Sequence, residues 1–472
     1  MDLNEEDAEF LNSLRIQPHG FKFQNWARTF SSQPTYYVAP TSEQDISRIV
    51  RIANKHKLTV KAVGSGHSPS DIACTNAIML NMDKMNRFIS CDAEAATVQG
   101  GMRLYQLHEE LKQRQLALSN LGSISDQSIA GAIATATHGT GIEYGDMSDM
   151  VVGLVLIDGQ GQRQECSLAH NRTLLDAARC HLGALGIVTQ VTIKCEPMFW
   201  LRAVQEPESF ISVTQDLHAV AKSAEHVRVW WFPHTDNAVV WRANRTRSRT
   251  RKSPESFVRD RLYGFHIYQM QLLKARCFPN SIPHLTREHF ARRFDFRREW
   301  VDEGFRVFNF DCLFPQYVNE WAVPLDQAAE ALQELQQWTD ESGARVHFPV
   351  EIRFVRGTSV WLSPASGDQV VCYIGVIMYR PYHRPVPYKA YWQAFERIMR
   401  KHEGRPHWAK AHGMFFHDFV SRYPRFNQFL ETRNQCDPHH VFVNDYLRRH
   451  ILPPGTSQNQ QESQISTENP RL

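Results

Sequence analysis

The chain has 472 residues, of which 42% are hydrophobic and 22% charged, and its formal net charge is +3. The length predicts two or three domains, or two of which one is interrupted, and the composition is ordinary for a globular protein. These values speak against a nucleic-acid-binding protein, which usually presents a concentrated basic face. No apolar run reaches the roughly 18 residues that a membrane-spanning helix needs. The acidic first ten residues lack the apolar core of a secretory signal, so none is expected.

The first part of the chain predicts a βαβ unit. Residues 40–56 form an amphipathic helix that Ser42 can cap, between strands at 36–38 and 58–63. The loop VGSGHSPSD (63–71) follows the second strand, at the end where α/β proteins place ligand sites. The apolar stripe of the helix consists of Ile46, Ile49, Val50 and Ala53.

The α/β pattern continues through the amino-terminal half. A segment rich in small residues, 120–141, interrupts it, and we expect a first domain over residues 1–196. Further strands are expected at 96–101, 150–158 and 185–195, and a helix at 103–114.

The chain after Pro197 has a different pattern, typical of an α+β domain. Residues 226–243 predict a hairpin, and the basic segment 245–261 a solvated loop rather than a membrane-surface patch. The polar tail, 453–472, is expected to be disordered. Strands are expected at 347–355 and 370–380, and a helix at 324–342 with Ala328, Ala331, Leu332, Leu335 and Trp338 facing inward.

Nine cysteines are scattered along the chain, and no CxxC pair occurs among them. This odd, dispersed set is typical of reduced thiols in an intracellular protein. The same spacing disfavours a metal site, and we expect no metal.

Two glycine- and serine-rich segments are candidates for a ligand cradle. Convergent backbone N–H groups in GSGHSPS (64–70) suit a phosphate, but the loop fits neither GxGxxG nor a Walker motif. Taken alone, the loop is equally consistent with a structural turn, in which His67 would be an ordinary hydrogen-bonded turn residue. The second segment, 123–141, could bring its backbone close to a large flat ligand. Alternatively, its small residues could allow a strand and a helix to pack closely. Together, the two segments favour a dinucleotide.

Two further motifs carry candidate catalytic groups. Glu351 and Arg353 alternate with apolar residues, so both point to one face of a strand, either as a surface ion pair or toward a ligand. GRPHWAKAH (404–412) brings His407 and Lys410 close together, or else begins a helix with solvated cations. Phe348, Val350, Ile352 and Phe354 are expected to face a core.

Nine motifs, taken in order, identify a resemblance to a known family. They are VGSGHSPSDIACT (63–75), GGMRLYQL (100–107), SNLGSISDQSIAG (119–131), THGTG (137–141), RVWWFPHT (228–235), PVEIRF (349–354), YRPY (379–382), RPHWAKAH (405–412) and DPHHVFVNDYL (437–447). This series resembles the sugar-1,4-lactone oxidases of the vanillyl-alcohol-oxidase flavoprotein superfamily. The resemblance extends from about Phe21 to Leu452 and is weakest over 244–300.

The resemblance implies an α+β, two-domain fold. An FAD-binding domain of the PCMH type, residues 1–196, would be completed by a returning segment, 405–452, and covered by an α/β cap domain, 197–404. His67 matches a histidine bonded covalently to the flavin 8α-methyl carbon. The other matching FAD positions are Ala62, Val63, Gly64, Ser65, Gly66, Ser68, Ser123, Ser128, Gly131, Thr135, Ala136, Thr137, His138, Gly141 and Ile187, with His407 nearby in its motif.

The resemblance also implies catalytic roles. Glu351 matches the carboxylate that holds the substrate hydroxyls at the reacting carbon, and Arg353 and Lys410 match cations near the flavin N1–C2=O edge. Such cations stabilise negative charge that develops on the flavin during hydride transfer. Gly122 stands where family oxidases carry glycine and plant dehydrogenase relatives carry alanine. With His67 present as well, we expect O2 as the electron acceptor and H2O2 as a product.

The expected reaction is oxidation of L-gulono-, L-galactono- or D-arabinono-1,4-lactone at C2, giving ascorbate or an analogue. An alditol or other sugar-alcohol oxidase of the same superfamily is one alternative, and a noncatalytic flavoprotein is the other.

The expected location is intracellular, in the cytoplasm or on an ER or mitochondrial membrane. The terminal PRL only loosely resembles the peroxisomal signal SKL. Membrane contact is expected to be peripheral at most, because charges interrupt the region that is apolar in animal relatives; a helix packed on the cap is an equal alternative. The apolar residues available for such contact are Phe257, Leu262, Phe265, Ile267, Met270 and Leu273.

Overall fold

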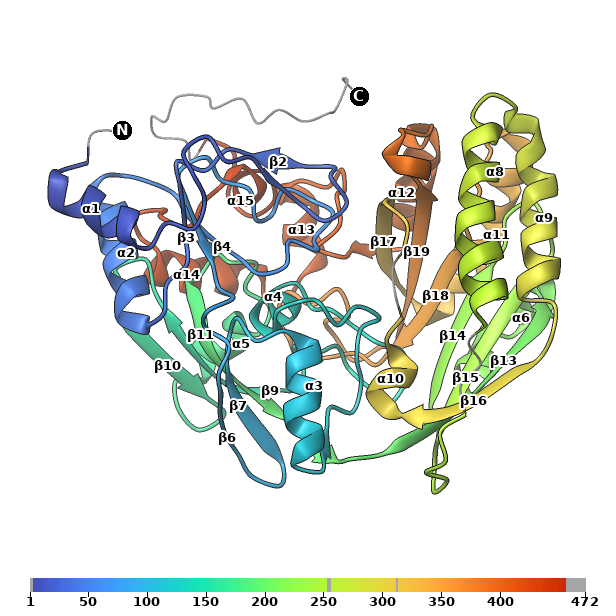
Figure 1. The fold of residues 1–472 in the computed structure, drawn as a ribbon, viewed down its shortest axis with the longest axis horizontal. Coiled ribbons are helices and arrows are strands. Elements are labelled where there is room, and N and C mark those ends of the chain that lie inside the picture. Colours follow the sequence, from blue (N-terminus) through green and yellow to red (C-terminus); the bar gives the residue numbers. More distant parts are fainter. Residues whose placement is uncertain (1–2, 253–255, 311–312, 456–472) are drawn as a thin grey trace.

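The computed structural model describes residues 3–252, 256–310 and 313–455. An amino-terminal half lies beside a large sheet with its helices, and the carboxyl-terminal segment returns to the amino-terminal half (Figure 1). Residues 456–472 of the predicted disordered tail lie outside the described residues, as do residues 253–255 of the predicted basic loop. The described cysteines are all free thiols.

The predicted βαβ unit is confirmed. Strands β3 (Tyr36–Val38) and β4 (Val60–Val63) both pair in parallel with β5 (Ile78–Asn81), which lies between them. Helix α2 (Glu43–Lys55) begins with a capping box, in which Ser42 Oγ accepts from the Asp45 N–H and the Asp45 carboxylate accepts from the Ser42 N–H, both at 3.1 Å. The predicted apolar stripe of this helix is fully buried against the sheet.

A second, antiparallel sheet completes the amino-terminal half. Its strand order is β10-β9-β11-β7-β6, and the strands predicted near 96, 150 and 185 are β7, β9 and β11. The bounds are β6 (Phe88–Cys91), β7 (Ala95–Gln99), β9 (Val151–Ile157), β10 (Arg163–Ser167) and β11 (Ile187–Lys194), with helices α3 (Leu104–Gln113), α4 (Ile129–Ala134) and α5 (Arg172–Ala178).

An eight-stranded sheet forms the other half, in the order β16-β13-β15-β14-β18-β19-β17-β20. The predicted hairpin is β14 and β15, and the predicted pair of later strands is β18 and β19. The bounds are β13 (Trp200–Ser209), β14 (His226–Trp231), β15 (Asn237–Thr246), β16 (Arg298–Glu303), β17 (Gln316–Pro324), β18 (Val350–Val355), β19 (Val371–Tyr379) and β20 (Arg405–Pro406).

One face of this sheet is apolar and packs against α6 (Phe210–Gln215), α7 (Leu217–Lys222), α11 (Leu325–Glu341) and α12 (Lys389–Lys401). The predicted inward residues of α11 are buried, except that Trp338 is only half-buried. Val350, Ile352 and Phe354 of β18 face this core. The expectation for Phe348 is wrong: it precedes the strand, so the alternation does not extend to it, and it lines a cavity.

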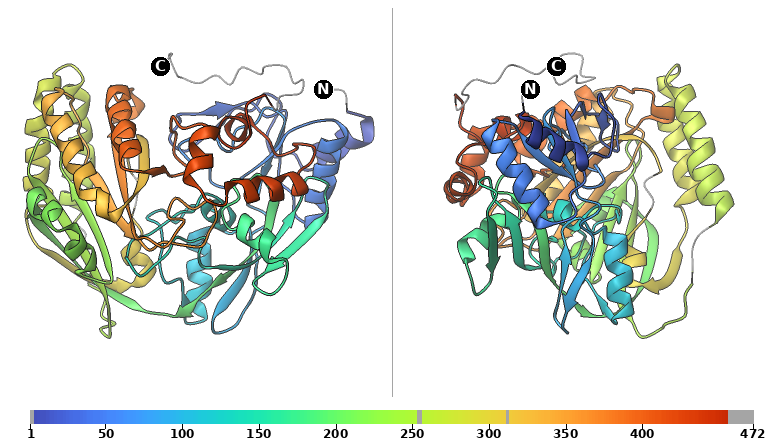
Figure 2. Two further views of the ribbon diagram at one scale, coloured as in Figure 1. Left: turned by 180° about the vertical axis from the view of Figure 1, so that it is seen from behind. Right: turned by 60° about the vertical axis from the view of Figure 1, so that its left-hand side comes forward.

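The opposite face of the sheet is partly covered by a pair of helices, which agrees with the alternative of a helix packed on the cap. A π-helix, η1 (Phe257–Ile267), continues into α8 (Tyr268–Ala275), and α9 (Ile282–Arg293) runs back along it. Seen from the two sides, this pair and α11 lie on opposite faces of the sheet (Figures 1 and 2). The predicted loop at 245–261 is therefore wrong at both ends, because β15 reaches Thr246 and η1 starts at Phe257.

The carboxyl-terminal segment packs on the amino-terminal half. The Val60 N–H donates to the Val441 carbonyl at 2.8 Å, and the Asn444 side chain donates to the carbonyls of Ile72 and Cys74 at 3.0 Å. The divisions at 196/197 and 404/405 remain predictions. Helices of this segment are α13 (Phe416–Arg422), α14 (Phe426–Cys436) and α15 (Asp445–His450).

The remaining elements are short. They are α1 (Glu5–Ser13), β1 (Phe23–Gln24), β2 (Ser31–Ser32), β8 (Leu116–Ala117), β12 (Glu196–Pro197), η2 (Pro279–Ser281), α10 (Gly304–Phe308) and η3 (Pro381–His383). Among the described helices, none combines the length and apolarity required to cross a membrane.

Candidate active site

A cavity of about 240 Å³ lies between the two halves. One wall comes from the glycine- and serine-rich loops of the amino-terminal half, and the other from the polar face of the eight-stranded sheet. Residues 407–410 and the helical pair complete it. Of the residues that the sequence singled out, the cavity is lined by His67, Ser68, Gly122, Ser123, Thr137, His138, Glu351, Arg353, His407 and Lys410.

The first loop presents His67 at the cavity, where its ring stacks on Trp26 at 5.3 Å between centroids. Its Nε2 lies 4.0 Å from Asp126 Oδ2. Burial lowers the pKa of His67 to about 4, against the opposing effect of Asp126. The imidazole is therefore neutral at neutral pH, with a lone pair available as a nucleophile.

The backbone here is shaped for close approach. Gly66 has φ +67°, a conformation that side chains other than glycine rarely adopt, and a Cβ at Gly64 would collide with Ser128. A Cβ at Gly122 would lie 2.7 Å from Thr137 Cγ2. Among these three glycines only Gly122 lines the cavity, while Gly64 and Gly66 let the loop that carries His67 turn tightly beside that wall. A flat ring system with a phosphate-bearing tail, as in FAD, fits such a wall.

The other predicted FAD positions do not line this cavity. Val63 and Ile187 are buried in strands β4 and β11, and the Gly141 N–H donates to the Phe354 carbonyl at 2.7 Å. The cofactor roles of these positions remain predictions. The rest of this group is Ala62, Gly64, Ser65, Gly66, Ser128, Gly131, Thr135 and Ala136.

Glu351 and Arg353 lie on the cavity face of β18, and their side chains are only 12% and 11% exposed. The alternative of a surface ion pair is therefore wrong. Glu351 Oε1 accepts from Trp230 Nε1 at 3.3 Å and lies 3.9 Å from Arg228 Nη1. Burial lowers the pKa of Arg228 to about 10, against the opposing effect of Glu351, so Arg228 remains a cation.

A buried carboxylate that the sequence analysis missed, Glu320 on β17, organises the cations. Arg353 Nη2 donates to Glu320 Oε1 at 2.5 Å, and Lys410 Nζ lies 3.7 Å from Glu320 Oε2. Burial raises the pKa of Glu320, but the positive charges of Arg353 and Lys410 outweigh that effect and hold its pKa well below the usual range. Glu320 is thus an anion that fixes the position of both cations.

Two buried histidines border this cluster. His138 Nε2 lies 3.4 Å from Glu320 Oε1, and its ring stacks on Tyr373 at 3.5 Å. Burial lowers the pKa of His138 and of His407, so both rings are neutral. The ligand atoms of His138, Glu320 and His407 lie within 4.8 Å of one another, as in a metal site. Because Glu320 is already paired with two cations, ion pairing accounts for the cluster.

The alternative for the GRPHWAKAH motif, a helix start with solvated cations, is also wrong. His407 and Trp408 are buried, no helix starts there, and the Trp408 indole donates to the Leu362 carbonyl at 2.6 Å. This anchored turn directs Lys410 into the cavity.

Comparison with known proteins defines the class first. Residues 34–167 match an FAD binding domain. The solved structure of cholesterol oxidase from B. sterolicum superimposes with a TM-score of 0.77 at 16% identity, covering 93% of this chain and 98% of that one. At that identity the likeness concerns the fold alone. Fold and domain together define a flavoprotein that binds FAD, as the sequence predicted.

The family is equally clear. Residues 191–450 match the D-arabinono-1,4-lactone oxidase family. The chain is 41% identical to L-gulonolactone oxidase of Scyliorhinus torazame, over 91% of this chain and 98% of that protein. It is 31% identical to D-arabinono-1,4-lactone oxidase of Candida glabrata, over 83% of this chain and 84% of that protein. It is 33% identical to L-gulono-1,4-lactone dehydrogenase of Mycobacterium tuberculosis, over 91% of this chain and 99% of that protein. The chain therefore belongs to the aldonolactone oxidase family, and it is an FAD-linked enzyme.

Proposed function

We propose that the protein oxidises an aldono-1,4-lactone, such as L-gulono-, L-galactono- or D-arabinono-1,4-lactone, at C2 and passes the electrons to O2. The observation that carries this proposal is a cavity lined by both loops, where Glu351 and Arg353 share one face of β18 and Lys410 enters from the turn after β20. FAD bound against those loops supplies the hydride acceptor.

The chain's own residues do the rest. Glu351 accepts a hydrogen bond from the C2 hydroxyl and orients the C2–H bond toward the loops. Trp230 holds this carboxylate in place by a hydrogen bond at 3.3 Å, and Arg228 Nη1 lies 3.9 Å from it. Arg353 and Lys410 place positive charge where negative charge develops, and Glu320 prevents them from moving. The lactone loses two hydrogens to become the 2-keto compound, and O2 takes up two electrons and two protons to become H2O2.

Oxygen rather than another acceptor is proposed because of Gly122. It lines the cavity without a side chain, and its carbonyl accepts from Asn309 Nδ2 at 3.0 Å, which holds the loop in place. A methyl group at this position would meet Thr137 Cγ2 at 2.7 Å, so alanine would force this part of the cavity wall to shift.

The function is tested with the purified FAD-containing protein. Each lactone, added without oxygen, is expected to abolish the visible absorption of FAD, and readmitted air is expected to restore it with one H2O2 per lactone. Bleaching by alditols but by none of the lactones would assign the sugar-alcohol reaction instead. No bleaching by either class would remove the enzymatic proposal, and reoxidation by cytochrome c but hardly by air would remove the oxidase part.

His67 is proposed to hold FAD covalently through the 8α-methyl carbon. Acid precipitation of the protein is therefore expected to give a yellow pellet, and His67→Ala is expected to give a colourless one. The matched control is His138→Asn, which changes another buried histidine of the cavity and should leave the pellet yellow. A colourless wild-type pellet, or a yellow His67→Ala pellet, would contradict the tether.

We also propose an intracellular location, cytoplasmic or at the surface of an organelle membrane, with peripheral contact at most. Leu262 and Met270 of the helical pair are exposed, whereas Phe265 packs against its apolar cluster, and the side chain of Phe257 lies outside the description. Cell fractionation with a salt wash tests this proposal, because peripheral contact predicts release by salt or high pH.

A further inference from the structure

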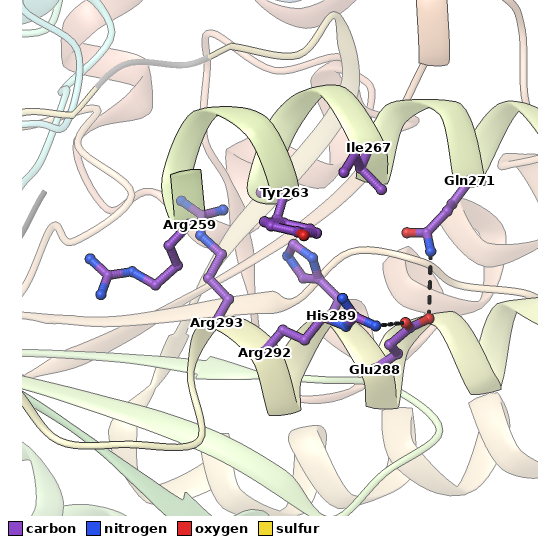
Figure 3. Close-up of a pocket in the computed structure, with 9 residues that line it drawn as sticks. Arg259, Tyr263, Ile267, Gln271, Glu288, His289, Arg292 and Arg293 are labelled. Carbon is purple, nitrogen blue, oxygen red and sulfur yellow. Dashed lines mark hydrogen bonds and ion pairs between the residues drawn. The ribbon is translucent and has the colours of Figure 1, made fainter. Parts of the chain in front are cut away.

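The end of the cavity at the helical pair is lined by polar groups to which the reaction assigns no role. His289 and Arg293 lie one helical turn apart on α9, and both line the active-site cavity and a small hollow between η1 and α9. Figure 3 shows their side chains rising from α9 into the space between the two helices. They are thus wall residues of the same cavity that contains Glu351.

A continuous wall connects these groups to the reacting centre. Trp230, which donates to Glu351, packs edge-on against Phe294 at 5.8 Å between ring centroids. Phe294 in turn contacts the His289 ring at 5.7 Å. A lactone whose C2 hydroxyl is held by Glu351 can therefore extend its remaining carbons along this wall, away from the glycine- and serine-rich loops.

Both side chains carry hydrogen-bonding groups at the cavity wall. Arg293 Nε faces Asp260 Oδ1 at 3.6 Å, too far for a hydrogen bond, and Asp260 also pairs with Arg259 and Arg298. Burial lowers the pKa of His289 to about 3, so its neutral ring offers one donor and one acceptor. A guanidinium and a neutral imidazole are suited to hydroxyl groups.

The helix opposite is shaped to admit the guanidinium. Gly264 lies in the π-helix η1, and a Cβ there would come within 2.8 Å of Arg293 Cζ. The glycine therefore lets Arg293 lie directly against the η1 backbone. Wide π-helical turns occur frequently at functional sites.

We propose that Arg293 and His289 determine substrate specificity by binding the hydroxyl groups of the exocyclic chain of the lactone. This inference rests on the proposed function and adds the recognition of the substrate end distant from C2. Arg293 would bind these hydroxyls equally in the ground state and in the transition state. Loss of these hydrogen bonds should therefore raise KM and leave kcat nearly unchanged.

The test compares two substrates in the FAD-containing enzyme. One is L-gulono-1,4-lactone, and the other is L-erythrono-1,4-lactone, which has the same configuration at C2 and C3 and no exocyclic carbons. Arg293→Gln is expected to raise KM for the longer lactone by about 10- to 100-fold, the effect of losing a hydrogen bond to a charged group, and to leave kcat and the KM of the shorter lactone nearly unchanged. His289→Phe is also expected to raise KM for the longer lactone more than KM for the shorter one.

Two further variants separate recognition from folding. Gly264→Ala is expected to reproduce the selective rise in KM, because the new methyl group displaces the guanidinium while alanine favours the helix. Arg292→Gln is the matched control: this neighbouring arginine pairs with Glu288 at 2.7 Å and does not line the active-site cavity. Equal losses for both lactones, or no loss for either, would overturn the proposal. If no lactone bleaches wild-type FAD, the proposed function itself fails, which is a distinct result.

Discussion

Glu351→Gln is expected to lower the rate constant for FAD reduction by the lactone by about 10²- to 10⁴-fold, the usual contribution of a positioned acid–base group. Glutamine has nearly the same shape and can still accept from the Trp230 indole, which donates at 3.3 Å in the wild type. It cannot take a proton from the C2 hydroxyl, and its neutral amide binds that hydroxyl more weakly. The measurement is rapid mixing of enzyme and lactone without oxygen, following the FAD absorption.

Trp230→Phe is the matched control for this variant. It keeps the aromatic packing against Phe294 but removes the N–H that fixes the carboxylate, so a smaller loss of rate is expected. Unchanged FAD content and thermal unfolding would show that both variants are folded. A loss of less than tenfold in Glu351→Gln would mean that the carboxylate has no central role in the reaction.

Arg353→Met is expected to reduce both rate and stability. Loss of one preorganised charge-stabilising group typically costs about 10²- to 10³-fold in rate. The same change removes the partner of the buried Glu320 at 2.5 Å, and breaking a buried pair costs roughly 3–5 kcal/mol. The free energy of unfolding should fall by about 3 kcal/mol, the lower end of that range, because Lys410 remains 3.7 Å from Glu320.

A double variant separates these two effects. Adding Glu320→Gln to Arg353→Met removes the uncompensated buried charge, so most of the stability is expected to return, as measured by denaturant unfolding, while the rate stays low. Recovery of the rate together with the stability would show that Arg353 acts only as a structural partner. If Arg353→Met alone were as stable as the wild type, Glu320 would not be the buried anion described above.

Much of the candidate site follows from local patterns. Loops 64–70 and 123–141 were recognised by their small residues, and both border the cavity. The alternation in VEIRF predicted a shared face for Glu351 and Arg353, whose charged groups lie 3.4 Å apart. Such patterns suffice because a strand places neighbouring side chains without help from the rest of the fold.

Glu320 could not be assigned in the same way. The available signal was a lone acid within the apolar run of β17, which predicts a buried charge that needs a partner but does not identify that partner. The pairing register of β17 and β18 with β19 identifies that partner. Glu351 and Glu320 both lie opposite Gly375, on either side of β19, so the register brings both carboxylates within reach of Arg353.

The sequence by itself determined the βαβ unit, the two glycine- and serine-rich loops, the polar face of β18 and, through its motifs, the family. These features depend on residues close together in the chain. Only the tertiary structure decided that Glu320 orders the cations and that α9 closes the far end of the cavity. Those contacts join strands and helices that are distant in sequence, and they arise when the sheet register and the packing of η1 against α9 bring the side chains together.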